Sequence, residues 1–222
     1  MTDAARLRAL HVPGDPLLLP NVWDAGSAQI VQEAGFPALA TASAAVAAML
    51  GYPDHEGAPV DEMLAAAARV IGAASVPVTV DAEAGYGLEP ADLARRLLAI
   101  GASGCNIEDT RGGAPVDPEV QAAYIAGVRA AAGDDLVINA RVDTFLRGGT
   151  PDEAVVRGRR YLEAGADCVY PILAPREAVS HLVEALPGPV NVFKAPDVPL
   201  KELVAAGVAR VRRPGSSGQV PN

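Results

Sequence analysis

Alanine-rich segments with helical spacing alternate with short β-branched apolar segments along most of the chain. Four of the helical segments end in a glycine that leads directly into the next β-like segment, namely Gly35, Gly101, Gly165 and Gly207. A glycine just past a helix end adopts the left-handed conformation that other residues resist. Repeated joints of this kind predict βα units and therefore a parallel sheet.

This pattern predicts a series of strands separated by helices. Strands are expected at Leu17–Trp23, Ala38–Ser43, Val78–Glu83, Gly104–Glu108, Leu136–Val142, Asp167–Ile172, Val190–Lys194 and Ala209–Arg212. Helices are expected at Ser27–Glu33, Val60–Ala74, Pro90–Ile100, Pro118–Ala131, Pro151–Ala164, Arg176–Ala185 and Leu200–Ala206. A long connection without an assigned element joins the second strand to the helix at Val60.

The alternation predicts an α/β fold, a (β/α)8 TIM-type barrel that forms one domain over residues 1–222. No glycine-rich dinucleotide motif follows the first strand, which disfavours a Rossmann fold. Residues 213–222 have no helical pattern, so the eighth helix is expected to be missing. The apolar surface left there could be covered by a partner subunit, which makes a homo-oligomer, a dimer or tetramer, one expectation.

Composition narrows the functional classes. The net charge of -9 argues against nucleic acid and anionic membrane as partners, but not against a small anionic substrate. The chain has no secretory signal core and no apolar run long enough to span a bilayer. Its two cysteines, Cys105 and Cys168, fall inside expected strands and are interpreted as buried thiols, so we expect a cytoplasmic protein.

The expected strands end in polar residues, and chemistry in such barrels takes place at these ends. Asp81 and Glu83 stand two apart and should share a face of the third strand. The fourth strand ends in Glu108, which completes an all-oxygen cluster without histidine or cysteine nearby. Such ligands suit Mg²⁺, or Mn²⁺, rather than zinc.

The fifth strand brings Asn139, Arg141 and Asp143 onto one face. Arg141 could hold a substrate carboxylate or phosphate in a two-pronged contact. A metal ion together with an arginine would stabilise an enol or enolate intermediate. These residues therefore predict both a cation site and an anion clamp.

Simpler interpretations exist for each of these residues. A single acid at a strand end is more often a helix cap or an ion-pair partner than a metal ligand. No catalytic role is assigned to His11, His55 or His181. The segment Arg212-Arg213-Pro-Gly-Ser-Ser-Gly could cradle a phosphate, but an unstructured terminus is the preferred interpretation.

From about Leu19 to Arg212 the chain resembles the isocitrate lyase/phosphoenolpyruvate mutase superfamily. The motifs that carry this resemblance are Asn21-Val-Trp-Asp-Ala-Gly-Ser-Ala, Thr41-Ala-Ser43, Asp81-Ala-Glu-Ala-Gly-Tyr-Gly87, Asn106-Ile-Glu-Asp109 and Asn139-Ala-Arg-Val-Asp143. Their combination and order are specific, whereas each alone would be weak. The resemblance implies a Mg²⁺-dependent barrel that acts on small 2-oxo or 2-hydroxy carboxylates through an enolpyruvate-type intermediate.

The resemblance also implies individual roles. Asp81 resembles the direct metal ligand, and the residues that resemble holders of the metal's water molecules are Glu83, Glu108 and Asp54. Arg141 resembles the substrate clamp, with Asn139 beside it on the same strand. Ser43, with the backbone of Ala44 and Ala45, resembles the segment that binds the substrate carboxylate. The family usually has aspartate where Glu83 stands, which changes the local geometry.

The largest departure from the family follows the fourth strand. Isocitrate and methylisocitrate lyases carry a gating loop with a Lys-Lys-Cys-Gly-His motif there, and phosphonomutases use an asparagine and a lysine-threonine pair. In this chain Thr110-Arg-Gly-Gly-Ala-Pro-Val-Asp117 has none of these residues and runs straight into the next helix. The general acid or base is therefore not identified.

Several functions remain open at this stage. The first is a Mg²⁺-dependent carbon–carbon lyase or decarboxylase on an oxaloacetate- or malate-like acid, for which Asp81, Glu108 and Arg141 are the catalytic candidates. The alternatives are a phosphoenolpyruvate- or phosphonopyruvate-type mutase or hydrolase, and a Schiff-base aldolase that uses Lys194. A non-enzymatic alternative is a degraded, metal-dependent carboxylate-binding protein.

Overall fold

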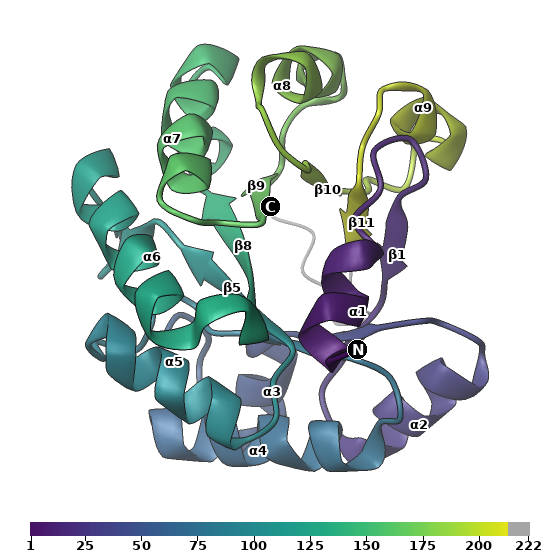
Figure 1. Cartoon of the computed structure of the whole chain (residues 1–222), viewed down its shortest axis with the longest axis vertical. Coiled ribbons are helices and arrows are strands. Elements are labelled where there is room, and N and C mark those ends of the chain that lie inside the picture. Colours follow the sequence, from purple (N-terminus) through teal and green to yellow (C-terminus); the bar gives the residue numbers. More distant parts are fainter. Residues whose placement is uncertain (213–222) are drawn as a thin grey trace.

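Eight parallel strand positions close into a barrel with the helices arranged around it, as Figure 1 shows for the computed structural model, which describes residues 1–212. The predicted (β/α)8 barrel is thus confirmed. A backbone bridge between Val169 and Val190 connects the two parts of the barrel wall. The strands are β1 (Leu17–Leu19), β2 (Asn21–Val22), β3 (Leu39–Thr41), β4 (Val78–Asp81), β5 (Gly104–Glu108), β8 (Val137–Val142), β9 (Cys168–Pro171), β10 (Asn191–Phe193) and β11 (Arg210–Arg212).

The first barrel strand is divided at Pro20 rather than continuous from Leu17 to Trp23 as predicted. Proline has no backbone N–H to donate to a ladder, so pairing is interrupted there. β1 pairs with β11 and β2 pairs with β3, so the two short pieces face different neighbours. The division lets this strand position close the barrel.

The predicted helices are confirmed with shifts of a few residues at their ends. Those with Pro at the first turn begin where expected, because the missing N–H costs nothing there. The four joint glycines all have φ between 82° and 103°, as the left-handed turn requires. The α-helices are α1 (Asp3–Ala9), α2 (Ala25–Glu33), α3 (Ser43–Leu50), α4 (Val60–Ala73), α5 (Pro90–Ala99), α6 (Pro118–Ala132), α7 (Pro151–Glu163), α8 (Val179–Ala185) and α9 (Leu200–Ala205).

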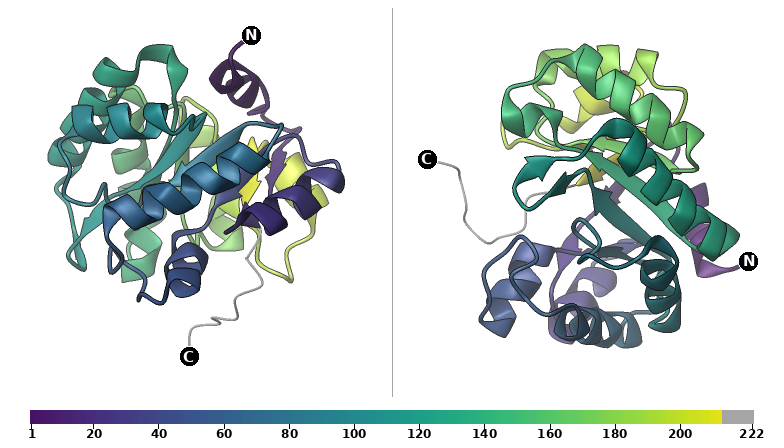
Figure 2. Two further views of the ribbon diagram at one scale, coloured as in Figure 1. Left: turned by 90° about the horizontal axis from the view of Figure 1, so that it is seen from below. Right: turned by 90° about the vertical axis from the view of Figure 1, so that its left-hand side faces the viewer.

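Two helices were not predicted. α3 occupies the connection that was left unassigned, and its first residue is Ser43, so the second strand ends earlier than expected. α1 lies across the amino-terminal ends of the strands, and the left view of Figure 2 shows it at one end of the barrel. There Ala4 and Leu7 pack with Leu17, Leu19 and Val137 in a buried cluster.

A short hairpin stands where a direct run into the next helix was predicted. β6 (Thr110–Arg111) pairs antiparallel with β7 (Ala114–Pro115) across a turn at Gly112 and Gly113. Their φ values of 54° and 76° match a turn type that favours glycine at both central positions. The predicted absence of an eighth helix concerns residues 213–222, which lie outside the described residues.

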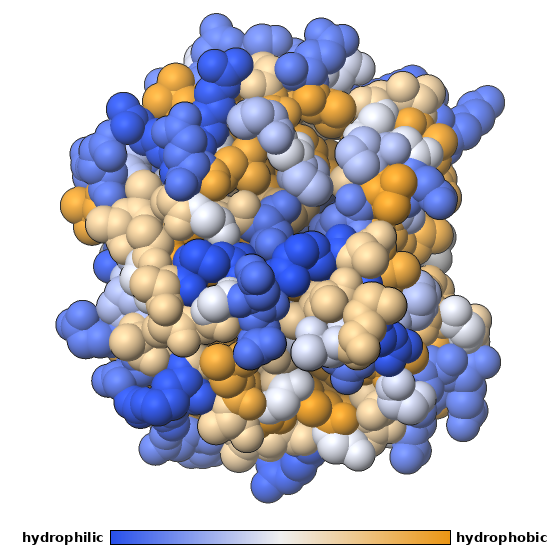
Figure 3. Space-filling model, in the orientation of Figure 1, coloured by the Kyte–Doolittle hydropathy of each residue, from blue (hydrophilic) through white to orange (hydrophobic). Residues whose placement is uncertain are grey.

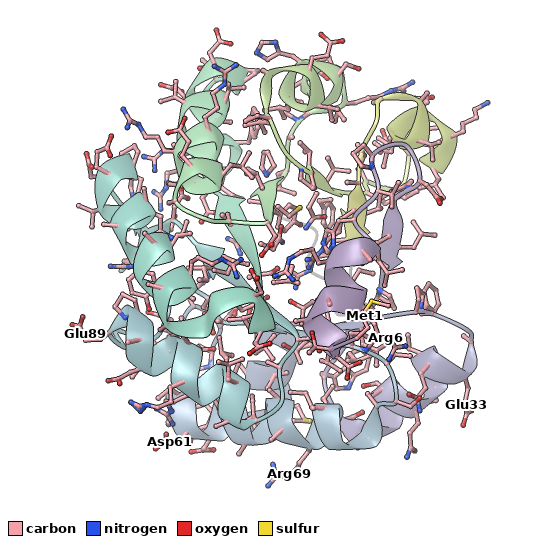
Figure 4. The ribbon with its side chains drawn as sticks, viewed as in Figure 1. Met1, Arg6, Glu33, Asp61, Arg69 and Glu89 are labelled. Carbon is pink, nitrogen blue, oxygen red and sulfur yellow. The ribbon has the colours of Figure 1, made fainter. Side chains whose placement is uncertain are left out.

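The outer faces of the helices are charged, and most of the buried side chains are apolar. Glu33 and Arg69, labelled in Figure 4, lie at the periphery on α2 and α4. Figure 3 shows hydrophilic residues interspersed with apolar ones over one whole face. Cys105 and Cys168 are buried and unbonded, as predicted, and burial raises the pKa of each thiol to about 12. No helix within residues 1–212 is long and apolar enough to cross a membrane.

Candidate active site

The carboxyl ends of β4, β5 and β8 bring the predicted acids and the arginine together. The register pairs Asp81 with Asn106 and Asn106 with Asn139, and one level further along it pairs Glu108 with Arg141. In-register partners on parallel strands point to the same side of the sheet. The sequence-predicted residues therefore occupy two adjacent levels at the mouth of the barrel.

Arg141 is bonded to two carboxylates. Its Nη1 donates to Glu108 Oε1, and its Nε and Nη2 donate to the two oxygens of Asp143 at 2.6 and 3.3 Å. The Asp143 backbone N–H donates to Asp109 Oδ1 at 2.8 Å, which fixes the loop after β8. Arg141 is thus held in place by a fork-to-fork contact with Asp143. No role was predicted for Asp143, although its alternation with Arg141 placed it on the correct face.

Glu108 lies between the arginine and the other acids. Its pKa is raised to about 8, mainly by burial and also by the negative charges of Asp81, Asp143 and Glu83, while Arg141 opposes the shift. An excess of negative charge at one place is what a cation would relieve. The electrostatics of this residue therefore agree with the predicted cation site.

Asp81 lies one level deeper and is also surrounded by donors. Its Oδ2 accepts hydrogen bonds from Arg212 Nη2 at 3.0 Å, from Ser43 Oγ at 3.2 Å and from the Ser43 N–H at 3.3 Å. Burial would raise the pKa of Asp81, but Arg212 and Arg141 lower it below its usual value. The other oxygen, Oδ1, is buried and has no hydrogen-bond partner within residues 1–212.

The prediction that Asp81 and Glu83 share one face of the third strand is wrong. β4 ends at Asp81, and Glu83 has a left-handed backbone with φ of 46°, so the alternation of a strand does not reach it. Its carboxylate accepts hydrogen bonds from the Glu56 N–H at 2.5 Å and from the Tyr86 hydroxyl at 2.8 Å. Glu83 remains close enough to Asp81 for their charges to interact, and burial raises its pKa.

The predicted substrate-binding residues are placed at different depths. Ser43, Ala44 and Ala45 form the first turn of α3, but the Ser43 N–H and hydroxyl both donate to Asp81. Asn139 is fully buried below the mouth, where its Nδ2 donates to Asn106 Oδ1 at 2.7 Å. Of this set, Arg141 alone lines the cavity at the mouth.

This cavity measures about 390 Å³. The β6–β7 hairpin, which lies in the segment that departs from the family, forms part of its lining. Two further residues, His55 from the loop before α4 and Arg147 from the 3₁₀ turn at Thr144–Arg147, had no role assigned from the sequence. Only the place of these two residues in the fold reveals them, because no periodicity or motif marks them. Its lining residues are His55, Glu56, Glu83, Ala84, Glu108, Thr110, Gly112, Gly113, Arg141, Asp143, Leu146 and Arg147.

A second cavity of about 560 Å³ lies on the other side of Asp143 and Arg147, between the hairpin and α7. It is larger, but among the predicted metal and substrate residues none lines it. Lys194 lines neither cavity, and its Nζ donates to the carbonyl oxygen of Ala195 at 3.3 Å. We therefore place the candidate site in the smaller cavity and in the acids beneath it.

The fit of a metal ion can be judged from these atoms. Within residues 1–212, no three histidine, cysteine, aspartate or glutamate side chains are arranged to bind one ion directly. The direct three-acid cluster of Asp81, Glu83 and Glu108 is thus not formed. An arrangement with one direct ligand fits, because Asp81 Oδ1 and Asp54 Oδ1 are buried oxygens without partners in the described part of the chain.

Comparison with known proteins agrees with this architecture. The profile of the family described as phosphoenolpyruvate phosphomutase matches residues 7–218. The 2-methylisocitrate lyase of Escherichia coli K12 is 32% identical over 198 residues, which cover 78% of this chain and 65% of the lyase. An uncharacterized protein of Mycobacterium tuberculosis H37Rv is 35% identical over 96% of this chain and 81% of its own length.

Solved structures of related proteins superpose on this chain over most of its length. A protein of Burkholderia cenocepacia J2315 assigned as a phosphonomutase superposes with a TM-score of 0.89 at 41% identity, covering 95% of this chain and 92% of that one. Phosphoenolpyruvate phosphomutase from Streptomyces platensis subsp. rosaceus superposes with a TM-score of 0.87 at 28% identity, covering 94% and 79%. Phosphonopyruvate hydrolase in complex with oxalate and Mg²⁺ gives 0.87 at 25% identity, covering 96% and 80%.

Proposed function

The chain belongs to the phosphoenolpyruvate phosphomutase family of the isocitrate lyase/phosphoenolpyruvate mutase superfamily, and on that basis we propose that it is a Mg²⁺-dependent carbon–carbon lyase or decarboxylase. Its substrate would be a small 2-oxo or 2-hydroxy dicarboxylate of the oxaloacetate or malate type. Relatives in this superfamily include 2-methylisocitrate lyase and 2,3-dimethylmalate lyase.

The observation that carries the proposal is the charge balance of the cavity at the mouth. Four carboxylates and two guanidinium groups line it, which leaves negative charge in excess. An anionic substrate would add to that excess in a partly buried site, at a large electrostatic cost. A divalent cation would offset the cost and allow a carboxylate to bind.

The residues that would hold the ion follow from the fit described above. Asp81 would bind it directly, whereas Glu83, Glu108 and Asp54 would hold its water molecules. Mg²⁺ prefers such a site, with few carboxylates and several retained waters, and Mn²⁺ accepts the same oxygen ligands. When bound, the ion would stabilise the negative charge that develops on the substrate oxygen as the bond breaks.

Two arginines would bind the substrate. Arg141 is partly buried and rigidly held by Asp143, so its guanidinium would orient one carboxylate once that group replaces Glu108 as its partner. Arg147 donates one hydrogen bond, to the carbonyl oxygen of Gly113 at 2.7 Å, and forms no ion pair within residues 1–212. Its remaining N–H groups could bind a second carboxylate, which supports a dicarboxylate substrate.

A phosphonate reaction is the second candidate, because phosphonopyruvate hydrolase is among the similar structures. The short hairpin weakens this alternative, since it contributes neither lysine nor asparagine to the cavity. Scission of a carbon–carbon bond or loss of CO₂ makes the smallest demand on the groups present. Binding of oxalate with Mg²⁺ but no turnover would instead indicate a carboxylate-binding protein.

The test is a substrate screen in the presence of Mg²⁺. Two- to six-carbon oxo- and hydroxy-acids, together with phosphonopyruvate, would be incubated with the protein and followed for release of pyruvate, glyoxylate, oxalate or phosphate. We expect turnover of a four- to six-carbon dicarboxylate that is lost on chelation with EDTA and in Asp81→Ala. Turnover that survives either treatment would refute the proposed metal dependence.

A further inference from the structure

Arg212 forms an ion pair with Asp81, the residue whose carboxylate would bind the metal ion in the proposed function. Its Nη2 lies 3.0 Å from Asp81 Oδ2, and both side chains are almost completely buried, with 8% and 3% of their surfaces exposed. A buried ion pair of this kind is difficult to open, because either charge alone in the interior is costly. Arg212 is therefore a permanent neighbour of Asp81 rather than a surface charge that happens to touch it.

The guanidinium is also fixed from other directions. Its Nε donates to Asn21 Oδ1 at 3.2 Å, and its Nη2 lies 3.5 Å from the Thr41 carbonyl oxygen. These acceptors and Asp81 come from β2, β3 and β4, so Arg212 spans the ends of three neighbouring strands from its place on β11. With partners on three strands, the side chain has little freedom to turn away when another cation arrives.

Asp81 nevertheless keeps one oxygen unused. Oδ1 is buried and has no hydrogen-bond partner within residues 1–212, whereas Oδ2 is taken by Arg212 and Ser43. A cation bound through Oδ1 would share one carboxylate with the guanidinium. Two positive charges on a single buried carboxylate repel each other, and the repulsion is strong where water is excluded.

We propose that Arg212 competes with the divalent cation for Asp81: it neutralises the carboxylate in the absence of metal and weakens metal binding when the ion arrives. This inference rests on the proposed function, because it takes Asp81 as the direct ligand. It adds that the metal affinity is set by Arg212 of the last described strand, a residue that is not among those lining the cavity.

Direct measurement of metal binding tests the competition without a substrate. Mn²⁺ would be titrated into the apoprotein and the free ion followed by electron paramagnetic resonance, with calorimetry as a second readout. Arg212→Gln removes the positive charge and should lower the Kd for Mn²⁺ by about tenfold or more. Arg212→Lys keeps the charge, and its Kd should stay within about threefold of the wild-type value.

Ser43→Ala is the matched control, because it removes a neutral hydrogen-bond donor to the same Asp81 oxygen. It should change the Kd less than Arg212→Gln does, since no charge is lost. Equal or weaker Mn²⁺ binding by Arg212→Gln would overturn the competition while leaving the metal site intact. Absence of Mn²⁺ binding in every variant and in the wild type would overturn both the competition and the proposed metal dependence.

Arg212→Gln leaves a buried carboxylate without its partner and is expected to unfold at a lower temperature. Mn²⁺ should then raise the unfolding temperature of the variant more than that of the wild type. If the variant does not fold, the wild type still gives an answer through the ¹⁵N side-chain signal of Arg212. Saturating Mg²⁺ should shift this signal, and an unchanged signal at full Mg²⁺ occupancy would overturn the proposal.

Discussion

Asp167, at the end of the barrel that α1 covers, accepts hydrogen bonds from Arg8 Nε at 2.7 Å, from the Ile138 N–H at 2.7 Å and from Arg129. One carboxylate there meets two arginines. At the opposite end, four carboxylates line a cavity with two arginines, and Asp81 beneath it has a buried oxygen without a partner in residues 1–212. The carboxylate at the first end is thus fully paired, whereas carboxylates outnumber guanidinium groups at the other end.

This difference in pairing distinguishes charged groups that stabilise the fold, such as Asp167, from charged groups that are available to bind a ligand, such as the acids at the mouth. A partly buried ion network whose members are all paired costs little free energy. The network around Asp167 also joins distant segments, namely α1, α6 and β8. Uncompensated acids reduce stability, so a protein tolerates them where a ligand supplies the missing charge. Substitutions at the two ends should therefore separate loss of activity from loss of stability.

The largest effect is expected at the mouth, for Arg141→Lys. A lysine keeps the charge but cannot make the forked contact with Asp143 or present two parallel donors to a substrate carboxylate. We expect kcat/KM for the accepted acid to fall by about a thousandfold, on the order of 4 kcal/mol in transition-state binding. Steady-state kinetics checks this, and a loss of less than tenfold would show that charge alone suffices.

At the end of the barrel that α1 covers, here called the closed end, Asp167→Asn should reduce stability rather than activity. The substitution removes the charge that Arg8 and Arg129 share, leaving both part-buried guanidinium groups without their carboxylate. We expect a loss of about 3 kcal/mol in the free energy of unfolding, measured by urea denaturation. The kcat of the folded fraction should match that of the wild type. A loss of activity comparable to that of Arg141→Lys would show that the two ends do not contribute separately to stability and activity.

Much of this contrast could be predicted from the sequence. The spacing of apolar residues predicts the helices and strands, and the polar residues at the strand ends predict which side chains meet at the mouth of the barrel. The (β/α)8 barrel, the four glycine joints and the grouping of Asp81, Glu108 and Arg141 were all predicted correctly. Alternation along a strand sufficed for these residues, since β5 and β8 are regular up to Glu108 and Arg141. Their functional roles stay predictions.

The parts that sequence reasoning missed depend on contacts between distant segments. Arg212 was considered with the terminal segment, although its alternation with Arg210 on β11 could have directed both into the barrel. His55 and Arg147 carry no periodic signal, and their approach to the cavity depends on loop conformation. Glu83 was placed on a strand face, but its backbone leaves the strand after Asp81.

A smaller effect concerns His11, which is buried beside α1 with Nδ1 2.8 Å from the Leu7 carbonyl oxygen. Burial, together with the nearby Arg210, lowers its pKa from 6.5 to about 4. Between those values the unfolded chain binds a proton that the folded chain does not, so stability falls as the pH drops from 6.5 towards 4. The contribution reaches about 3 kcal/mol at the lower limit.

Urea denaturation at pH 7 and at pH 4.5 would measure this dependence, and His11→Gln isolates it from the other titrating groups. The variant should lose less stability than the wild type between the two pH values, by about 2 kcal/mol. Parallel pH profiles for the two proteins would mean that His11 can be protonated without unfolding. The closed end would then be more open to water than its packing indicates.

The smallest effect is expected for Arg147→Gln, which tests whether the exposed rim of the mouth contributes to substrate choice. Arg147 is the guanidinium at the cavity that forms no ion pair within residues 1–212, and its bond to Gly113 leaves most of its donors available. Because the group is exposed, its contact with a second carboxylate should contribute about 1 kcal/mol to binding. Arg147→Gln should therefore increase the KM for a dicarboxylate about five- to tenfold, with little change in kcat.

A monocarboxylate of the same chain length is the matched control, since it lacks the group that Arg147 would bind and its KM should not change. An equal increase for both substrates would assign Arg147 to the support of the hairpin turn, and the recognition of the second carboxylate would then have to come from the buried residues of the mouth.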